Sequence, residues 1–140
     1  MEWVAKAKPG DDAAEIAAEQ LGYMGADVCP HIHAAWSQAT PVGRELFLDI
    51  LRKIPGDDKT LALLIEALEK QAEKRALYAS FLGAYGDERA LPFLQAKLQE
   101  PDLDYLAYVE LVQAIEALGG TPKHTRSFDG DDDYEALRNL

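Results

Sequence analysis

Cysteine, basic residues and long apolar runs are all scarce in this chain of 140 residues. The single cysteine, Cys29, excludes an internal disulfide and fits a reducing compartment. No stretch approaches the roughly 18 consecutive apolar residues that a membrane-spanning helix needs. The first residues are too polar, and their apolar part too short, for a secretory signal, so we expect a cytoplasmic protein.

The shortage of basic residues argues against two further classes of partner. The chain has 14 Lys and Arg against 25 Asp and Glu, which gives a net charge of −11. Such a surface repels phosphate backbones, because affinity for nucleic acid depends on Lys and Arg displacing counterions. Anionic membranes are disfavoured for the same reason. We therefore expect no nucleic-acid or membrane partner. The acidity either keeps the protein soluble or attracts a basic partner, and both interpretations stay open.

The feature that the sequence does contain is an internal repeat. Residues 56–64 resemble residues 86–94, which lie 30 positions later, with the glycine, the first aspartate and two leucines identical. Similar glycines recur along the chain at spacings of 31, 30 and 34 residues, at Gly25, Gly56, Gly86 and Gly120. This spacing indicates structural units of about thirty residues, each closed by a glycine.

Each unit has the pattern of two short helices. After the Gly–Asp pair, leucines recur at helical spacing, as at Leu61, Leu64 and Leu68. The glycine is suited to end one helix in a left-handed conformation, and Asp57 or Asp87 to accept hydrogen bonds from the free amides of the next. Neither helix of a pair can bury its apolar stripe alone, so the pairs are expected to stack.

The pattern therefore predicts an all-α chain without strands, because no segment shows sustained period-two alternation. The expected repeat domain covers residues 1–120. Residues 121–140 break the pattern and are expected to form a polar linker and a short capping helix from residue 134 to the end. The helices are expected near residues 12–24, 27–39, 42–54, 57–69, 73–84, 88–99 and 103–118.

The string from Phe81 to Leu94, FLGAYGDERALPFL, is similar to the "ALGxLGDxRALPxL" junction of short HEAT-like repeats of the phycobilin lyase type. Weaker copies extend the resemblance over roughly residues 12–120. It implies a short right-handed α-solenoid of about three and a half helical pairs. The chain departs from the family at Glu100-Pro101-Asp102, which resembles its Asp-Pro-Asp turn but lacks the arginine that follows. Only Arg75 stands where such an arginine is expected, so an incomplete Asp–Arg ladder is implied.

The resemblance also brings enzymes into consideration. Deoxyhypusine hydroxylases of this architecture bind iron through repeated His-Glu pairs, and no histidine in this chain is followed by Glu. DNA glycosylases of HEAT-like fold need a basic cleft, which the net charge opposes. Phycobilin lyases are closer in repeat type but generally longer, so a lyase-like enzyme stays as an alternative.

Cys29-Pro30-His31-Ile32-His33 is the only cluster of soft ligands. On a helix Cys29 and His33 share one face, while His31 points elsewhere. The pair has the residue types for two metal ligands, or for a thiol and its base. However, a structural zinc site needs four ligands, and Cys29 continues an apolar stripe with Ile32 and Trp36. The favoured interpretation is a core cysteine with surface histidines, and we expect no metal, cofactor or catalytic residue.

The sequence thus favours a non-catalytic scaffold that binds a protein or peptide along a groove formed by the second helices of the pairs. The alternative is an acidic inhibitor or immunity-type protein directed against a basic protein. A lyase-like enzyme is a less favoured alternative. Polar side chains of the second helices are the candidate contacts: Glu45, Asp49, Glu110, Gln113 and Glu116.

Overall fold

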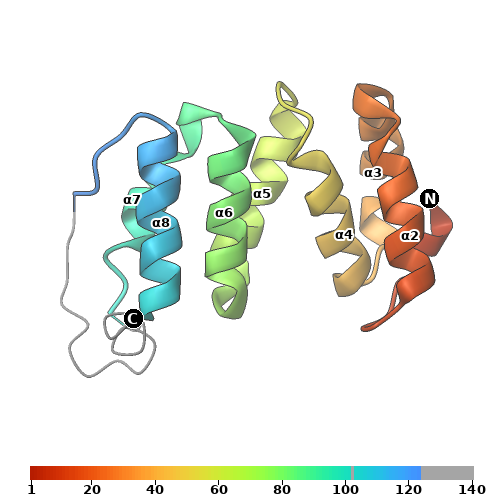
Figure 1. The fold of residues 1–140 in the computed structure, drawn as a ribbon, viewed down its shortest axis with the longest axis horizontal. Coiled ribbons are helices and arrows are strands. Elements are labelled where there is room, and N and C mark those ends of the chain that lie inside the picture. Colours follow the sequence, from red (N-terminus) through yellow and green to blue (C-terminus); the bar gives the residue numbers. More distant parts are fainter. Residues whose placement is uncertain (102, 124–140) are drawn as a thin grey trace, which may run out of the picture. The chain divides into compact units, whose positions relative to one another are not determined.

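The computed structural model describes residues 1–101 and 103–123, and every regular element within them is a helix. The predicted capping helix, which begins at residue 134, lies outside the described residues. Four short 3-10 helices accompany the α-helices, at Gly25–Val28, Trp36–Gln38, Ala72–Lys74 and Glu88–Ala90. The α-helices, labelled in part in Figure 1, are α1 (Glu2–Ala5), α2 (Asp12–Gly22), α3 (Cys29–Ala35), α4 (Pro41–Leu51), α5 (Asp58–Lys70), α6 (Arg75–Tyr85), α7 (Leu91–Lys97) and α8 (Tyr105–Ala117).

The chain divides into two compact units, Met1–Leu63 and Leu64–Leu140. All seven helices expected from the sequence are present, although proline-containing segments are split. In the last predicted pair, for example, Pro92 has no N–H to donate to the Glu88 carbonyl, so a 3-10 turn precedes α7. None of the described helices is long and apolar enough to cross a lipid bilayer.

The N-terminal unit is built around α4, which packs against α1 and α2 (Figure 1). Its core contains fully buried side chains of α4, among them Phe47 and Leu51, and Val4 of α1. Thr40 caps α4 by accepting a hydrogen bond from the Gly43 amide at 3.0 Å, and its own amide donates to the Ala5 carbonyl at 2.7 Å. Helix α1 was not expected from the sequence. It forms where Thr40 and the side-chain-free Gly43 let the chain approach α4 closely.

The C-terminal unit is organised by α6 and α8, which lie side by side with α7 against α8 (Figure 1). The two long helices approach closely because Gly83 of α6 faces Ala114 of α8, and a Cβ at Gly83 would come 3.0 Å from the Ala114 Cα. Buried side chains from both helices fill the interface, including Leu82 and Leu111. Leu94 and Leu98, which are four residues apart, are fully buried as well.

The predicted roles of the glycine and the aspartate at the start of a repeat are confirmed in the two repeats that resemble each other most. Gly56 and Gly86 have positive φ angles of 93° and 82°. Asp57 Oδ1 accepts a hydrogen bond from the Lys59 amide at 3.0 Å, and Asp87 Oδ1 accepts one from the Arg89 amide at 3.0 Å. The same capping geometry therefore appears twice, thirty residues apart.

The predicted position of the last helix-ending glycine is wrong by one residue. Gly119, and not Gly120, has the left-handed conformation, with φ of 85°. Gly120 serves instead for close packing, because a Cβ there would come 2.8 Å from Leu91 Cδ2 and 3.1 Å from Ile115 Cγ2.

The aspartates of the repeat do not share one kind of basic partner. Asp57 pairs with a histidine, His33, whereas Asp87 pairs with its own neighbour Arg89 at 2.7 Å. Arg75, the arginine at the expected ladder position, forms an ion pair with Glu100, which Lys97 also contacts at 3.1 Å. Arg75 is thus held by a glutamate after α7.

Candidate functional site

The five candidate contact residues fall into two groups, one in each unit. Glu45 and Asp49 lie one turn apart on α4, and both are half-buried. The others lie on α8, where Gln113 and Glu116 are exposed and Glu110 is half-buried. The members of each group therefore lie on a single helix.

Asp49 lines a groove of about 590 Å³ between α2 and α4. Its Oδ1 atom accepts a hydrogen bond from Arg52 Nε at 2.7 Å, and the Asp49 side chain is 44% exposed. Lys53 is the only cationic side chain in the lining. Apolar side chains form much of the rest, contributed by Ala18, Leu46 and Ile50.

Sequence reasoning missed the α2 side of this groove. Glu15 and Glu19 of α2 line it opposite Asp49, and both are exposed. A signal for them was present, because the small residues Ala14 and Ala18 are buried one turn apart and place the adjacent glutamates along one edge of the packed face. The pattern did not indicate that α4 would form the other side of the groove.

Tyr23 lines the same groove just after the end of α2, and 78% of its surface is exposed. Other large apolar residues of the N-terminal unit are exposed as well, with Trp3 at 68% and Ile16 at 61%. An exposed tyrosine beside a groove is a frequent anchor at protein interfaces, since its ring supplies apolar area and its hydroxyl a hydrogen bond.

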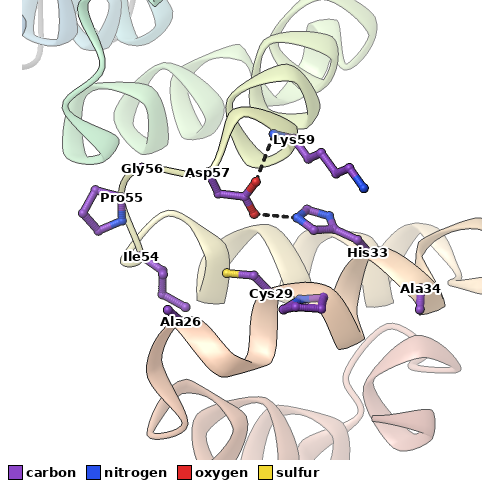
Figure 2. Close-up of a pocket in the computed structure, with 10 residues that line it drawn as sticks. Ala26, Cys29, His33, Ala34, Ile54, Pro55, Gly56, Asp57 and Lys59 are labelled. Atoms are coloured by element: carbon purple, nitrogen blue, oxygen red, sulfur yellow. Dashed lines mark hydrogen bonds and ion pairs between the residues drawn. The ribbon is translucent and has the colours of Figure 1, made fainter.

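A second pocket in the N-terminal unit contains the predicted cysteine–histidine cluster (Figure 2). Cys29 begins α3, His33 lies one turn later, and Asp57 precedes α5. His33 Nε2 is 2.7 Å from Asp57 Oδ2, and Figure 2 shows the carboxylate between the His33 ring and the start of α5. Thr60, which is fully buried, donates to the same carboxylate oxygen at 3.1 Å.

This arrangement shifts the pKa of two groups, the Asp57 carboxyl and the Cys29 thiol. Burial by itself would raise the pKa of the Asp57 carboxyl, but hydrogen bonds from His33, Thr60 and the Lys59 amide outweigh it and hold the pKa below its ordinary value. Burial raises the pKa of the Cys29 thiol, and the negative charge of Asp57 raises it further.

The electrostatics of this cluster do not favour an activated cysteine nucleophile. A reactive cysteine needs a cationic or basic neighbour that lowers the thiol pKa, whereas burial and the charge of Asp57 raise the pKa of Cys29. Cys29 is buried, as expected of a core residue. The expectation that both histidines are at the surface holds for the exposed His31 but is wrong for His33, whose side chain is only 14% exposed because it packs against Asp57.

Within the described part of the chain, no three His, Cys, Asp or Glu side chains are placed to hold a metal ion. In comparisons with known proteins, no family model, no curated protein and no solved structure matches this chain.

Proposed function

We propose that this protein is a non-catalytic binding module of the HEAT-like repeat type, and that its partner is a protein or peptide with a basic surface. The observation that carries the proposal is the groove between α2 and α4, where three carboxylates and an exposed tyrosine surround an apolar floor. A groove of this kind offers both apolar burial and charge complementarity to a cationic segment.

The HEAT-like part of the proposal is supported by local geometry. The repeated aspartate caps at Asp57 and Asp87 each follow a glycine of positive φ, and a helical segment follows each of them. This is the pattern expected where helical pairs are added one after another along a chain. Superposition of residues 57–69 on 88–99 in an experimental structure tests it, and failure of these segments to superpose would contradict a repeat.

The basic character of the partner is supported by charge. The chain carries −11, and the groove lining carries three carboxylates against one lysine. Complementary charge accelerates association and suppresses wrong partners, and its effect weakens as salt screens it. We therefore expect binding that is tight at low ionic strength and falls as salt rises.

Affinity purification from the native host tests the proposed function. The protein is immobilised, an extract is applied at about 50 mM NaCl, and bound proteins are eluted by raising NaCl to about 500 mM. We expect a basic protein to elute with rising salt and, after purification, to bind the chain with defined stoichiometry in calorimetry.

The control is a column that carries an unrelated helical protein of similar size and net charge. Proteins retained by both columns are general binders of acidic surfaces. If no basic protein is specific to the first column, or if the specific partner is acidic and resists salt, the proposal is wrong.

A further inference from the structure

The negative charge of the α2–α4 groove is concentrated on α2. Glu15 and Glu19 are exposed and lie one turn apart, and within the described residues neither carboxylate has a hydrogen bond or an ion pair. Asp49 on the opposite side is already paired with Arg52. A cation that enters the groove is therefore attracted more strongly to the α2 side, because it has no internal cation to displace there.

Just beyond the end of α2, the next residue along this stripe is aromatic. Tyr23 follows Glu19 by four residues, so the stripe carries two carboxylates and then an exposed ring. An arginine guanidinium suits this order, because its edge can form two parallel hydrogen bonds to a carboxylate while its face stacks on the ring. A lysine ammonium is a point charge and lacks the flat, bidentate geometry.

The floor of the groove complements the rest of an arginine side chain. Ala18, Leu46 and Ile50 supply apolar surface next to the carboxylates. The methylene stem of an arginine can lie on such a surface while its charged end stays at the rim. A second copy of this chain is a poor occupant, because it would bring a further net charge of −11.

We infer that the groove between α2 and α4 binds an arginine-bearing segment of a partner protein, with Glu15 and Glu19 as its ion-pair acceptors and Tyr23 as its stacking surface. The inference rests on the proposed function and assigns it a site and a recognised side chain.

Fluorescence anisotropy with synthetic peptides tests the inference. The probe is a short labelled peptide in which arginines alternate with leucines and serines, and it is compared with the same peptide carrying lysine or neutral citrulline in place of arginine. At about 50 mM NaCl we expect the arginine peptide to bind about fivefold more tightly than the lysine peptide, and the citrulline peptide not to bind.

Matched double variants locate the site. Glu15→Gln with Glu19→Gln should weaken binding of the arginine peptide about tenfold, and Tyr23→Ala should remove its preference over lysine. Glu69→Gln with Glu73→Gln changes the net charge equally but lies at the end of α5 and in the 3-10 helix after it, outside the groove, so its effect should stay within about twofold. Circular dichroism checks that each variant remains folded.

Several outcomes would overturn the inference. Equal losses in the two double variants would mean that only total charge matters, and equal binding of the arginine and lysine peptides would remove the stacking role of Tyr23. Dimerisation of the native chain that Tyr23→Ala abolishes would place a second copy in the groove. None of these outcomes decides the proposed function, which is judged by the specific basic partner recovered from the extract.

Discussion

The Asp57 carboxylate accepts hydrogen bonds from three neighbouring groups. It caps the start of α5 through the Lys59 amide and accepts hydrogen bonds from His33 and Thr60. Its negative charge also raises the pKa of the Cys29 thiol, which burial raises first. One carboxylate thereby links α3 to the first turn of α5, and two predictions follow from its charge.

The first prediction concerns acid stability. Asp57→Ala should lower the free energy of unfolding by about 2 kcal/mol near neutral pH, because α5 loses its cap and His33 its partner. Asp57→Asn should cost less, since an amide oxygen can still accept from the Lys59 amide. The pKa of Asp57 is lower in the folded than in the unfolded chain, so the stability that its charge contributes is present above the unfolded value.

That contribution is lost as the pH falls through the folded pKa. The measurement is urea unfolding of the native chain and Asp57→Asn from about pH 6 to about pH 3. The difference in unfolding free energy should shrink toward the acid end. A difference that stays constant over this range would show that the charge of Asp57 does not stabilise the fold.

The second prediction concerns the Cys29 thiol. Its raised pKa should make alkylation by iodoacetamide slow at pH values where a free cysteine reacts readily. Asp57→Asn should shift the pH profile of the alkylation rate to lower pH, because the negative charge beside the thiol is removed. Asp58→Asn is the matched control, since it removes the same charge at the adjacent, exposed position. Equal shifts in both variants would contradict a specific effect of the Asp57 charge on the thiol.

At the scale of helices, close approach depends on small residues at particular positions. Gly83 lets α6 pack against Ala114 of α8, and a Cβ there would lie 3.0 Å from the Ala114 Cα and 3.2 Å from its Cβ. Gly22, near the end of α2, has open space around the same position. These two helical glycines should therefore respond in opposite directions to the same substitution.

The third prediction compares them. Gly83→Ala should destabilise the protein by about 1 kcal/mol, because overpacking of about 1–3 kcal/mol exceeds the gain in helix propensity of roughly 1 kcal/mol. Gly22→Ala should be neutral or stabilising by up to about 1 kcal/mol, since only the propensity term acts. Chemical denaturation measures both. Stabilisation by Gly83→Ala would show that α6 and α8 are not in close contact.

At the scale of the whole molecule, the dominant feature is a net charge of −11 on 140 residues. Like charges repel more strongly in the compact folded state than in the expanded unfolded chain, so this charge destabilises the fold at low ionic strength. The same charge supplies the long-range attraction that we propose for a basic partner. Salt should therefore affect stability and binding in opposite directions.

The fourth prediction follows from this opposition. Raising NaCl from about 10 mM to about 150 mM should increase the melting temperature by about 3–5 °C, because screening relieves self-repulsion. Circular dichroism at the two salt concentrations measures the shift. The same increase in salt should weaken partner binding. A melting temperature that falls with salt would mean that favourable ion pairs, such as Arg75 with Glu100, outweigh the net repulsion.

The sequence by itself determined the helices, their caps and much of the core, because these features depend on neighbours along the chain. Helical spacing identified Leu64 and Leu68 as buried, and a glycine followed by an aspartate identified two helix starts. The apolar stripe through Cys29 likewise predicted its burial. The four residues of α1 were too few to show a helical period, so only packing against α4 reveals them.

The tertiary structure alone decided which side chains meet. His33 contacts Asp57 because the loop before α5 returns to α3, and a separation of 24 residues leaves no periodic signal of that contact. Glu15 and Glu19 share a groove with Asp49 because α2 and α4 pack together at one particular register. Local patterns specify where a helix begins and which face it buries. The packing of one face on another then specifies which charged groups are brought together at a site.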